Sequence, residues 1–147
     1  TKLLSFAAPP GRCNVKHFNG VTIIDDTYNA NLASSLAAID YLNAFSGNGR
    51  RILVFGDMFE LGTSSNEQHR RIGQKCSELN LDGVYTIGEH TKHTDSAISN
   101  GVDHSHYKSK DNLITSLKKK IIAGDKILFK GSRGMKMEKV IAGVFDL

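Results

Sequence analysis

The stretch Arg51-Ile52-Leu53-Val54-Phe55-Gly56-Asp57 decides the fold class. Its four central residues are all apolar and lack the alternation of a strand that has one face in water. This pattern is typical of a strand covered on both faces in a parallel sheet. Short runs rich in β-branched or aromatic residues, each followed by glycine or polar residues, predict strands over residues 21–24, 51–55, 83–87 and 126–129.

Helical patterns separate these strands. Leu36, Ile39 and Leu42 recur at intervals of three and predict a helix over residues 34–45. Similar reasoning predicts helices over residues 67–79, 92–100, 111–123 and 135–145. Strands that alternate with helices of this length indicate an α/β fold, with a parallel sheet and helices on both faces. In such sheets ligands bind beyond the carboxyl ends of the strands.

Capping signals mark the ends of three of these helices. The overlapping patterns Ser64-x-x-Glu67 and Ser65-x-x-Gln68 predict a capping box at the start of the second helix. Gly101 and Gly124 predict C-caps for the third and fourth helices.

Length and composition bound the class of protein. A chain of 147 residues, 39% of them hydrophobic, is expected to form one globular domain over residues 1–147. Its longest apolar runs have four residues, against about 20 for a membrane span, so we expect no contact with a membrane. The chain opens at Thr1 rather than methionine, and we expect it to be a piece of a longer polypeptide.

Charge and cysteine content exclude further classes. The 19 Lys and Arg against 15 Asp and Glu give +4, but apart from residues 118–120 these charges are spread along the chain. A nucleic-acid partner requires clustering on one face, so none is predicted. Cys13 and Cys76 lie far apart and predict neither a disulfide framework nor a zinc ribbon, which favours a reducing cytoplasm.

The loop after the first predicted strand is dense in polar groups. Asp25-Asp26-Thr27-Tyr28-Asn29-Ala30-Asn31 contains two carboxylates, two amides and a phenol. A carboxylate at this point can accept both hydroxyls of a ribose or hold Mg²⁺ through water, and a tyrosine can stack on a planar ring. The same Asp and Asn residues are also typical of Asx turns and of an N-cap for the next helix. The residues alone leave both interpretations open.

The loop after the second predicted strand contains two acids between glycines. Asp57 and Glu60 are candidates for binding a cation or an amine, whereas Met58 and Phe59 are expected to cover the edge of the sheet. His69 lies one turn into the next helix and is predicted to be a surface or packing residue rather than a ligand.

The loop after the last predicted strand favours an anion. In Lys130-Gly131-Ser132-Arg133-Gly134 two glycines allow close backbone approach, and three side chains supply donors beside a helix start. A phosphate or a carboxylate would suit this loop, although the chain contains no P-loop motif. The histidines at 90, 93, 104 and 106 have no acid or cysteine pattern around them, and no metal site is predicted.

Five strings occur in order along nearly the whole chain: Gly11-Arg12, residues 25–31, residues 51–62, His69-Arg70 and residues 130–138. Together they resemble the C-terminal domain of the Mur ligases and, within that family, the member that attaches D-Ala-D-Ala. The resemblance implies a Rossmann-like domain of a bacterial, cytoplasmic, three-domain ligase of peptidoglycan synthesis. It also implies an N-terminal domain for the UDP-sugar and a central P-loop domain for ATP, neither of which is in this chain.

The resemblance further implies the chemistry. In the family, ATP phosphorylates the peptide carboxylate of UDP-MurNAc-tripeptide, and the amine of D-Ala-D-Ala attacks the acyl phosphate to form an amide. ATP and Mg²⁺ would be held mainly by the central domain. This chain would supply positioning and electrostatics, would have no turnover alone, and would work as a monomer with the other two domains of its polypeptide.

Carried over residue by residue, the resemblance assigns two groups of contacts. Nucleotide contacts would come from Arg12 at the phosphates, from Asp26 at the ribose hydroxyls, and from Tyr28, Asn29 and Asn31. The carboxylate of D-Ala-D-Ala would meet Lys130, Ser132 and Arg133, while Asp57 and Glu60 would orient the amine or only hold the loop in shape. Leu32 departs from the family, which usually has proline there, and this predicts a loop at Asn31 that is looser or differently shaped.

Two other classes fit part of the pattern. A phospho-acceptor receiver domain would use Asp25 and Asp26 for Mg²⁺, Asp57 as the acceptor, and Lys130. Against it, Asp57 follows the second predicted strand rather than the third, and glycine rather than proline follows Lys130. A non-catalytic Rossmann-like interaction module is the third interpretation.

Overall fold

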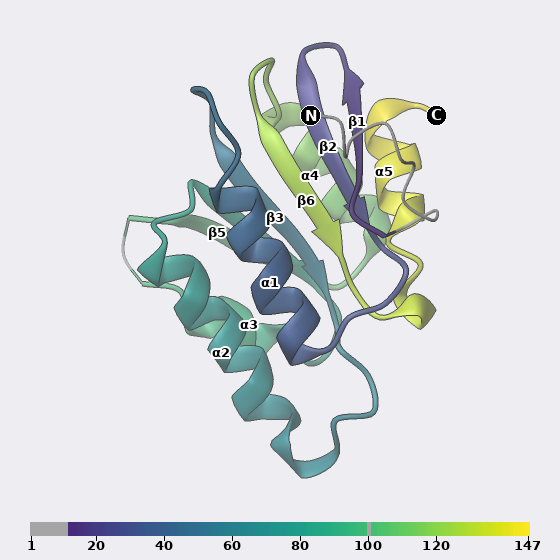
Figure 1. The fold of residues 1–147 in the computed structure, drawn as a ribbon. Coiled ribbons are helices and arrows are strands. Elements are labelled where there is room, and N and C mark those ends of the chain that lie inside the picture. The colour runs from purple at the N-terminus through teal and green to yellow at the C-terminus, as the bar shows by residue number, and fades with distance from the viewer. Residues whose placement is uncertain (1–11, 100) are drawn as a thin grey trace.

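The computed structural model describes residues 12–99 and 101–147 and contains a six-stranded sheet. Its strand order is β1-β2-β6-β3-β4-β5 (Figure 1). Only β1 runs antiparallel to its neighbour; every other pair of neighbouring strands is parallel. The strands are β1 (Asn14–Phe18), β2 (Val21–Asp26), β3 (Arg51–Gly56), β4 (Gly83–Ile87), β5 (Asp103–Tyr107) and β6 (Lys126–Lys130). The predicted α/β fold with a mostly parallel sheet is confirmed.

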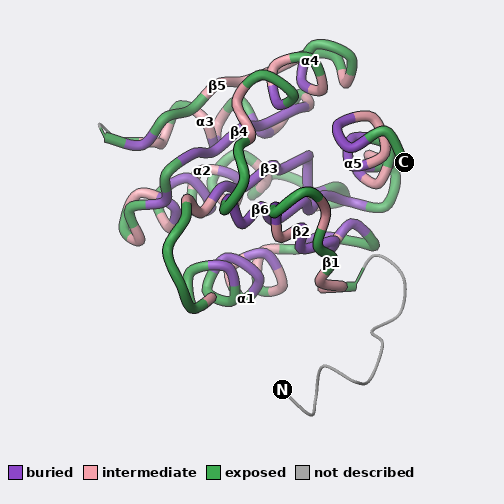
Figure 2. Tube along the Cα trace, turned by 90° about the horizontal axis from the view of Figure 1, so that it is seen from above, coloured by how far each residue is buried: buried purple, intermediate pink, exposed green. Residues whose placement is uncertain are grey.

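Helices cover both faces of the sheet (Figure 2). The α-helices are α1 (Leu32–Asn43), α2 (Ser65–Glu78), α3 (Lys92–Ser96), α4 (Lys110–Lys120) and α5 (Glu138–Phe145). One core cluster joins α1 and α2 to the sheet through residues such as Ile39 and Ile72. The other joins α4 and α5 to the opposite face through residues such as Leu117 and Val144. No helix of the described residues is long and apolar enough to span a bilayer.

Strand β3 lies inside the sheet, between β6 and β4. Ile52 and Val54 belong to the core on the α4 and α5 side, while Leu53 and Phe55 belong to the core on the other side. All four are at most 1% exposed. The absence of polar alternation in this stretch therefore follows from burial on both faces.

Two strands were not predicted from the sequence, and both lie at edges of the sheet. β1 reads Asn-Val-Lys-His-Phe and β5 reads Asp-His-Ser-His-Tyr, with no residue of either classed as buried. An edge strand gains its backbone hydrogen bonds on one side and needs little apolar side chain, so neither has an apolar run. The hairpin between β1 and β2 turns through Asn19 and Gly20, both with positive φ.

Several predicted helix ends are wrong. The third helix stops at Ser96 and is capped by Ala97, so Gly101 does not cap it, and Asn100 lies outside the described residues. The fourth helix ends at Lys120, and Gly124 instead turns the chain into β6 with a φ of +97°.

The capping box predicted at the start of α2 is also absent. Residues 62–64 form a 3₁₀ turn, and the Ser64 hydroxyl donates to the Leu61 carbonyl and accepts from the Gln68 side chain, but it accepts from no backbone N–H of the first turn. At the last helix, Lys136 adopts a left-handed conformation between the 3₁₀ turn η3 (Arg133–Met135) and α5, so the helix begins at Glu138 rather than at Met135 as predicted.

Candidate functional site

The three polar loops predicted from the sequence meet at one edge of the sheet. Strand β6 lies between β2 and β3, so Lys130 stands in register with Asp26 on one side and with Phe55 on the other. Because the three strands are parallel, their carboxyl ends open toward the same edge (Figure 1). This is the edge at which α/β sheets bind ligands.

A pocket of about 390 Å³ opens beside the end of β2. It is lined by Arg12, Cys13, Asp26, Tyr28, Asn29, Ala30, Asn31, Ser34 and Lys130. All five residues predicted to contact a nucleotide therefore line one cavity. Lys130, which was grouped with the dipeptide contacts, lines this pocket as well.

Asp26 is held from two directions at the end of β2. Its Oδ2 accepts a hydrogen bond from Lys130 Nζ at 2.8 Å, and its Oδ1 accepts one from the Cys13 backbone N–H at 3.1 Å. Lys130 Nζ also donates to the Asn29 carbonyl at 2.9 Å. The side chain of Lys130 is only 3% exposed and that of Asp26 14% exposed, so this is a largely buried ion pair.

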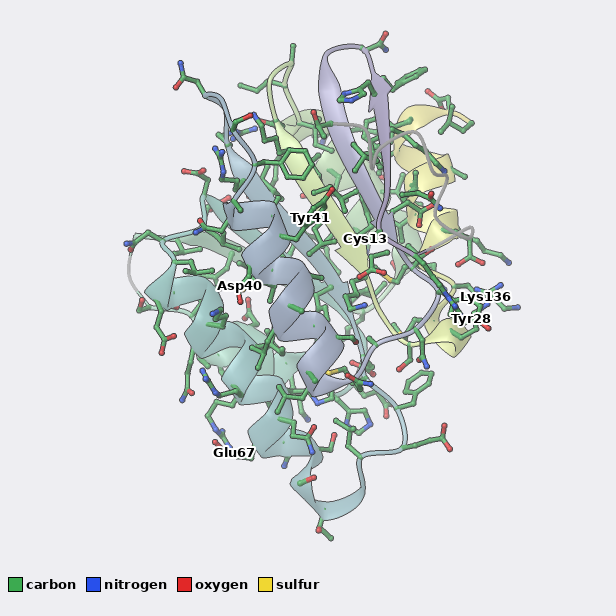
Figure 3. All side chains as sticks on the ribbon, viewed as in Figure 1. Cys13, Tyr28, Asp40, Tyr41, Glu67 and Lys136 are labelled. Atoms are coloured by element: carbon green, nitrogen blue, oxygen red, sulfur yellow. The ribbon has the colours of Figure 1, made fainter. Side chains whose placement is uncertain are left out.

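Arg12 and Tyr28 form the rim of the pocket. The guanidinium carbon of Arg12 lies 3.9 Å from the centre of the Tyr28 ring, a cation–π contact. Tyr28 is 45% exposed, and its side chain projects outward from the loop after β2 (Figure 3). A planar ligand that enters the pocket would find an aromatic face and a cation at its rim.

The two asparagines predicted as nucleotide contacts serve the loop itself. Asn29 Oδ1 accepts from the N–H of the next residue, Ala30, at 2.9 Å. Asn31 caps α1, with its Oδ1 accepting from the Ser34 N–H at 2.8 Å and the Ser34 hydroxyl accepting in return from the Asn31 N–H. Both interpretations of this loop therefore remain: its side chains line a cavity and also stabilise a helix start.

Leu32 does not alter this helix start. Asn31 has φ −131° and ψ 177°, the extended conformation that a following proline would favour. The capping hydrogen bonds hold Asn31 extended without the proline, so the expected change in the shape of the loop is not found.

The acidic pair is divided between two sets of partners. Asp25 is 6% exposed and accepts from the Thr27 hydroxyl at 2.7 Å and from Lys16 Nζ at 3.2 Å, whereas Asp26 binds Lys130. Two carboxylates that each have their own cation do not form a vacant Mg²⁺ site. Within residues 12–99 and 101–147, no group of three or more His, Cys, Asp or Glu side chains is placed to hold a metal ion.

Asp57 has a structural role at the end of β3. Its carboxylate accepts three backbone N–H groups, those of Glu89, His90 and Thr91, at 2.9–3.0 Å. It is 4% exposed, and a Cβ at Gly88 would come within 2.3 Å of its Oδ1. This carboxylate holds the loop after β4 in shape, which is the bracing role considered for it; Glu60, by contrast, is exposed and has a φ of 62°.

The burial of Asp57 also bears on the receiver interpretation. Because β1 escaped prediction, Asp57 follows the third strand, and the argument from strand count was wrong. The interpretation fails on other grounds: a phospho-acceptor must be reachable, and this carboxylate is enclosed. The strand order here also differs from the 2-1-3-4-5 order of receiver domains.

Of the two roles expected for His69, at the surface or in packing, the structure shows packing. It is fully buried, its Nε2 accepts from the Met58 N–H at 3.0 Å, and its Nδ1 lies 2.8 Å from the Ser65 carbonyl. These partners require the neutral tautomer with the proton on Nδ1. Burial, the largest cause, lowers the pKa of His69 below its usual value.

The loop after β6 is tied to the loop after β3. The Ser132 N–H donates to the Asp57 carbonyl at 2.9 Å, and Ser132 Oγ accepts from the Phe59 N–H at 2.7 Å. Arg133 is exposed and pairs with Glu138 at 2.9 Å. The three residues predicted to bind a carboxylate are therefore not brought together: Lys130 faces the β2 loop, Ser132 faces the β3 loop, and Arg133 faces solvent.

Two features of the site had no signal in the sequence. Cys13 has a φ of 52° and directs its N–H at Asp26, and burial raises the pKa of its thiol to about 11. Lys136 is an exposed cation with a left-handed backbone beside Arg133. Neither residue type favours such a conformation, so only tertiary structure reveals it.

The chain is similar to known proteins over most of its length. The family described as "Mur ligase, glutamate ligase domain" matches residues 11–133. The chain belongs to this family. The predicted resemblance to the Mur ligases is thereby confirmed, and the strand-end loops are those of a Mur ligase C-terminal domain.

Individual relatives agree. The UDP-N-acetylmuramoyl-tripeptide–D-alanyl-D-alanine ligase of Bacillus subtilis is 36% identical over 139 residues, which cover 90% of this chain and 30% of that protein. The ligase of the same name from Haemophilus influenzae is 40% identical over 134 residues, covering 84% and 27%. The chain thus spans about 30% of the length of these relatives.

A solved structure shows the same fold. The MurF ligase from Thermotoga maritima, crystallised in complex with ADP, superposes with a TM-score of 0.82 at 31% identity. The superposition covers 97% of this chain and 32% of that one.

Proposed function

We propose that this chain is the C-terminal domain of an ATP-dependent ligase that joins D-Ala-D-Ala to UDP-MurNAc-tripeptide in the bacterial cytoplasm. The observation that carries the proposal is the pocket at the end of β2, where Asp26, Tyr28 and Arg12 line one cavity at the ligand-binding edge of a Mur ligase fold. The names of the relatives, including one crystallised with ADP, supply the reaction and the nucleotide.

The pocket side of the site suits a nucleotide. The Asp26 carboxylate retains lone pairs for the two ribose hydroxyls, since each oxygen accepts one hydrogen bond from the described residues. Tyr28 supplies an exposed ring for stacking, and the Arg12 guanidinium supplies positive charge for phosphates. Asn29 and Asn31 hold the loop in the shape that places these groups.

Mg²⁺ would accompany ATP in this reaction, and its ligands would come mainly from the central domain. The ion pairs of this chain agree with that assignment, because Asp25 pairs with Lys16 and Asp26 pairs with Lys130. The cation neutralises phosphate charge when bound. This chain contributes positioning of the nucleotide and closure against the other two domains of a monomeric polypeptide.

The dipeptide would lie on the β3 and β6 side of the edge. Arg133 is an exposed cation for the carboxylate of D-Ala-D-Ala, and the Ser132 hydroxyl still has its proton to donate. Glu60 is the exposed acid that could hold the amine, while Asp57 acts only through the loop that it stabilises. Attack of that amine, in its neutral form, on the acyl phosphate would form the amide C–N bond and break the bond between the acyl carbon and the phosphate oxygen, releasing inorganic phosphate and a proton.

Backbone-amide chemical-shift mapping of the chain tests the proposal. Separate titrations would use Mg·ATP, D-Ala-D-Ala, and Mg²⁺ with beryllofluoride. We expect Mg·ATP to shift amides at 12–13, 26–31 and 130, and D-Ala-D-Ala to shift amides at 59–60 and 132–134, even at millimolar affinity, because a domain without its partners bears the full ordering cost. Absence of any shift with either ligand would favour an interaction module, and a response centred on Asp57 with beryllofluoride would favour a receiver.

The second expectation concerns turnover. The chain alone should form no amide from UDP-MurNAc-tripeptide and D-Ala-D-Ala in the presence of Mg·ATP, because its sequence carries no P-loop for the phosphates. Product formed by the 147-residue chain would overturn the assignment of ATP binding to another domain.

A further inference from the structure

Lys130 is a buried lysine at the end of the central strand β6. Lysine is almost never fully buried unless it is paired, and this side chain is only 3% exposed. It occupies the position between β2 and β3 where the two sides of the candidate site meet. Its partners therefore decide which side of the site it serves.

Both hydrogen-bond partners that the described residues give the ammonium belong to the nucleotide side. Nζ donates to Asp26 Oδ2 at 2.8 Å and to the Asn29 carbonyl at 2.9 Å, so one charge joins the end of β2 to the loop that follows it. Ser132 and Arg133, the residues with which Lys130 was first grouped, have their partners in the β3 loop and in α5 instead. The contacts separate Lys130 from the dipeptide contacts.

The positive charge of Lys130 offsets the negative charge of Asp26 in the pocket. A bare Asp26 carboxylate would repel the phosphates of a nucleotide bound in the same pocket, and like charges in a partly buried site interact strongly. Lys130 offsets the Asp26 charge and leaves the Arg12 guanidinium as the excess positive group at the rim. Asp26 can then accept ribose hydroxyls without a net negative field in the pocket.

We infer that Lys130 is a positioning residue for the nucleotide: it fixes the Asp26 carboxylate and the Asn29 loop, cancels the charge of Asp26, and does not bind the carboxylate of D-Ala-D-Ala. The inference rests on the proposed function, because it takes the pocket to be a nucleotide site. It assigns to Lys130 a role that acts through Asp26 rather than on the ligand.

A double-mutant cycle on ADP affinity tests this role. ADP would be titrated into the 147-residue chain and into K130M, D26N and D26N/K130M, with binding followed by amide shifts in the 26–31 loop. K130M should lower ADP affinity about tenfold, since truncating one partner of a buried pair leaves the other uncompensated. In the D26N background the same change should cost less than about twofold, because the charge that Lys130 offsets is gone.

Two further variants guard against a loss of fold. K130R keeps the charge and should stay within about threefold of the parent chain. Lys126 is the matched control: it is also buried in β6, but its Nζ donates to the Asn48 carbonyl at the opposite end of the strand. K126M should reduce stability without changing ADP affinity.

The outcomes separate the two claims. If the parent chain shows no ADP shifts in the 26–31 loop, the proposed function and this inference both fall. If the parent binds ADP there but K130M binds equally well, or loses as much affinity in the D26N background as in the parent, only the inference falls. If K130M loses the D-Ala-D-Ala response and keeps the ADP response, Lys130 binds the dipeptide, and the inference is overturned.

Discussion

Asp26 and Asp57 lie at the carboxyl ends of β2 and β3, on either side of β6, but their surroundings and their roles differ. Asp57 is 4% exposed and its oxygens accept three backbone N–H groups from the loop after β4. Asp26 faces a pocket, binds a buried lysine, and accepts only one backbone N–H from the described residues. The comparison teaches that an acid after a parallel strand becomes a binding group or a structural group according to its neighbours.

Removing Asp57 should have the largest effect on stability. Asp57→Ala leaves three N–H groups without their acceptor in a buried loop, and we expect a loss of about 3–5 kcal/mol in the free energy of unfolding. Urea denaturation followed by circular dichroism would measure it. Glu60→Gln, an exposed acid of the same loop, is the matched control and should stay within about 0.5 kcal/mol. A loss below about 1 kcal/mol for Asp57→Ala would contradict the structural role of Asp57 and favour a direct role in binding.

His69 is the second support of the β3 loop, and its effect should depend on pH. His69→Gln should cost about 1–3 kcal/mol at pH 7.5, since the Met58 N–H and the Ser65 carbonyl lose a well-placed partner. The folded-state pKa of His69 lies below its usual value of 6.5 because of burial. Its contribution is therefore present above pH 6.5 and is lost as the pH falls from 6.5 toward the lowered pKa.

Urea denaturation at pH 7.5 and pH 5.5 measures this slope. The parent chain should lose stability between the two values, and His69→Gln should lose less. His17→Gln, at an exposed position on β1, is the control, and it should keep most of the slope of the parent. An equal slope in the parent chain and in His69→Gln would show that His69 is not the group that titrates.

On the other side of the comparison, Tyr28 should matter for binding and little for folding. Tyr28→Ala should reduce ADP affinity about tenfold, the usual cost of removing one aromatic ring from under a base. Its free energy of unfolding should change by less than about 0.5 kcal/mol, because the ring is 45% exposed. Calorimetric titration with ADP would measure the first effect. Tyr41→Ala, 38% exposed on α1 and outside the pocket, should leave ADP affinity unchanged.

The smallest expected effect concerns the start of α1. Leu32 is the first residue of the helix and Asn31 is already extended, so Leu32→Pro should fit the native backbone. Proline there restricts the unfolded chain and should raise the free energy of unfolding by about 0.5 kcal/mol, measured by urea denaturation. A loss of more than about 2 kcal/mol would show that the Leu32 side chain or its N–H has a role that its position at the helix start does not reveal.

The sequence carried the fold further than the site. Residues 51–57 predicted a buried parallel strand because β3 is covered on both faces, whereas β1 and β5 escaped because edge strands need no apolar run. The strand-end loops were found by composition, since ligands bind there in such sheets. The sequence did not predict the partners of each side chain, because these partners are distant in the chain. Asp57 accepts from Glu89, which is 32 positions away, and Lys130 binds Asp26, which is 104 positions away.

The most direct test of the central claim is a crystal structure of the chain with Mg·ADP. The account predicts ADP in the pocket at the end of β2, with its ribose hydroxyls on the Asp26 carboxylate, its base against Tyr28, and Lys130 still bound to Asp26. Nucleotide bound elsewhere on the chain, or a pocket that stays empty at saturating ADP, would contradict it.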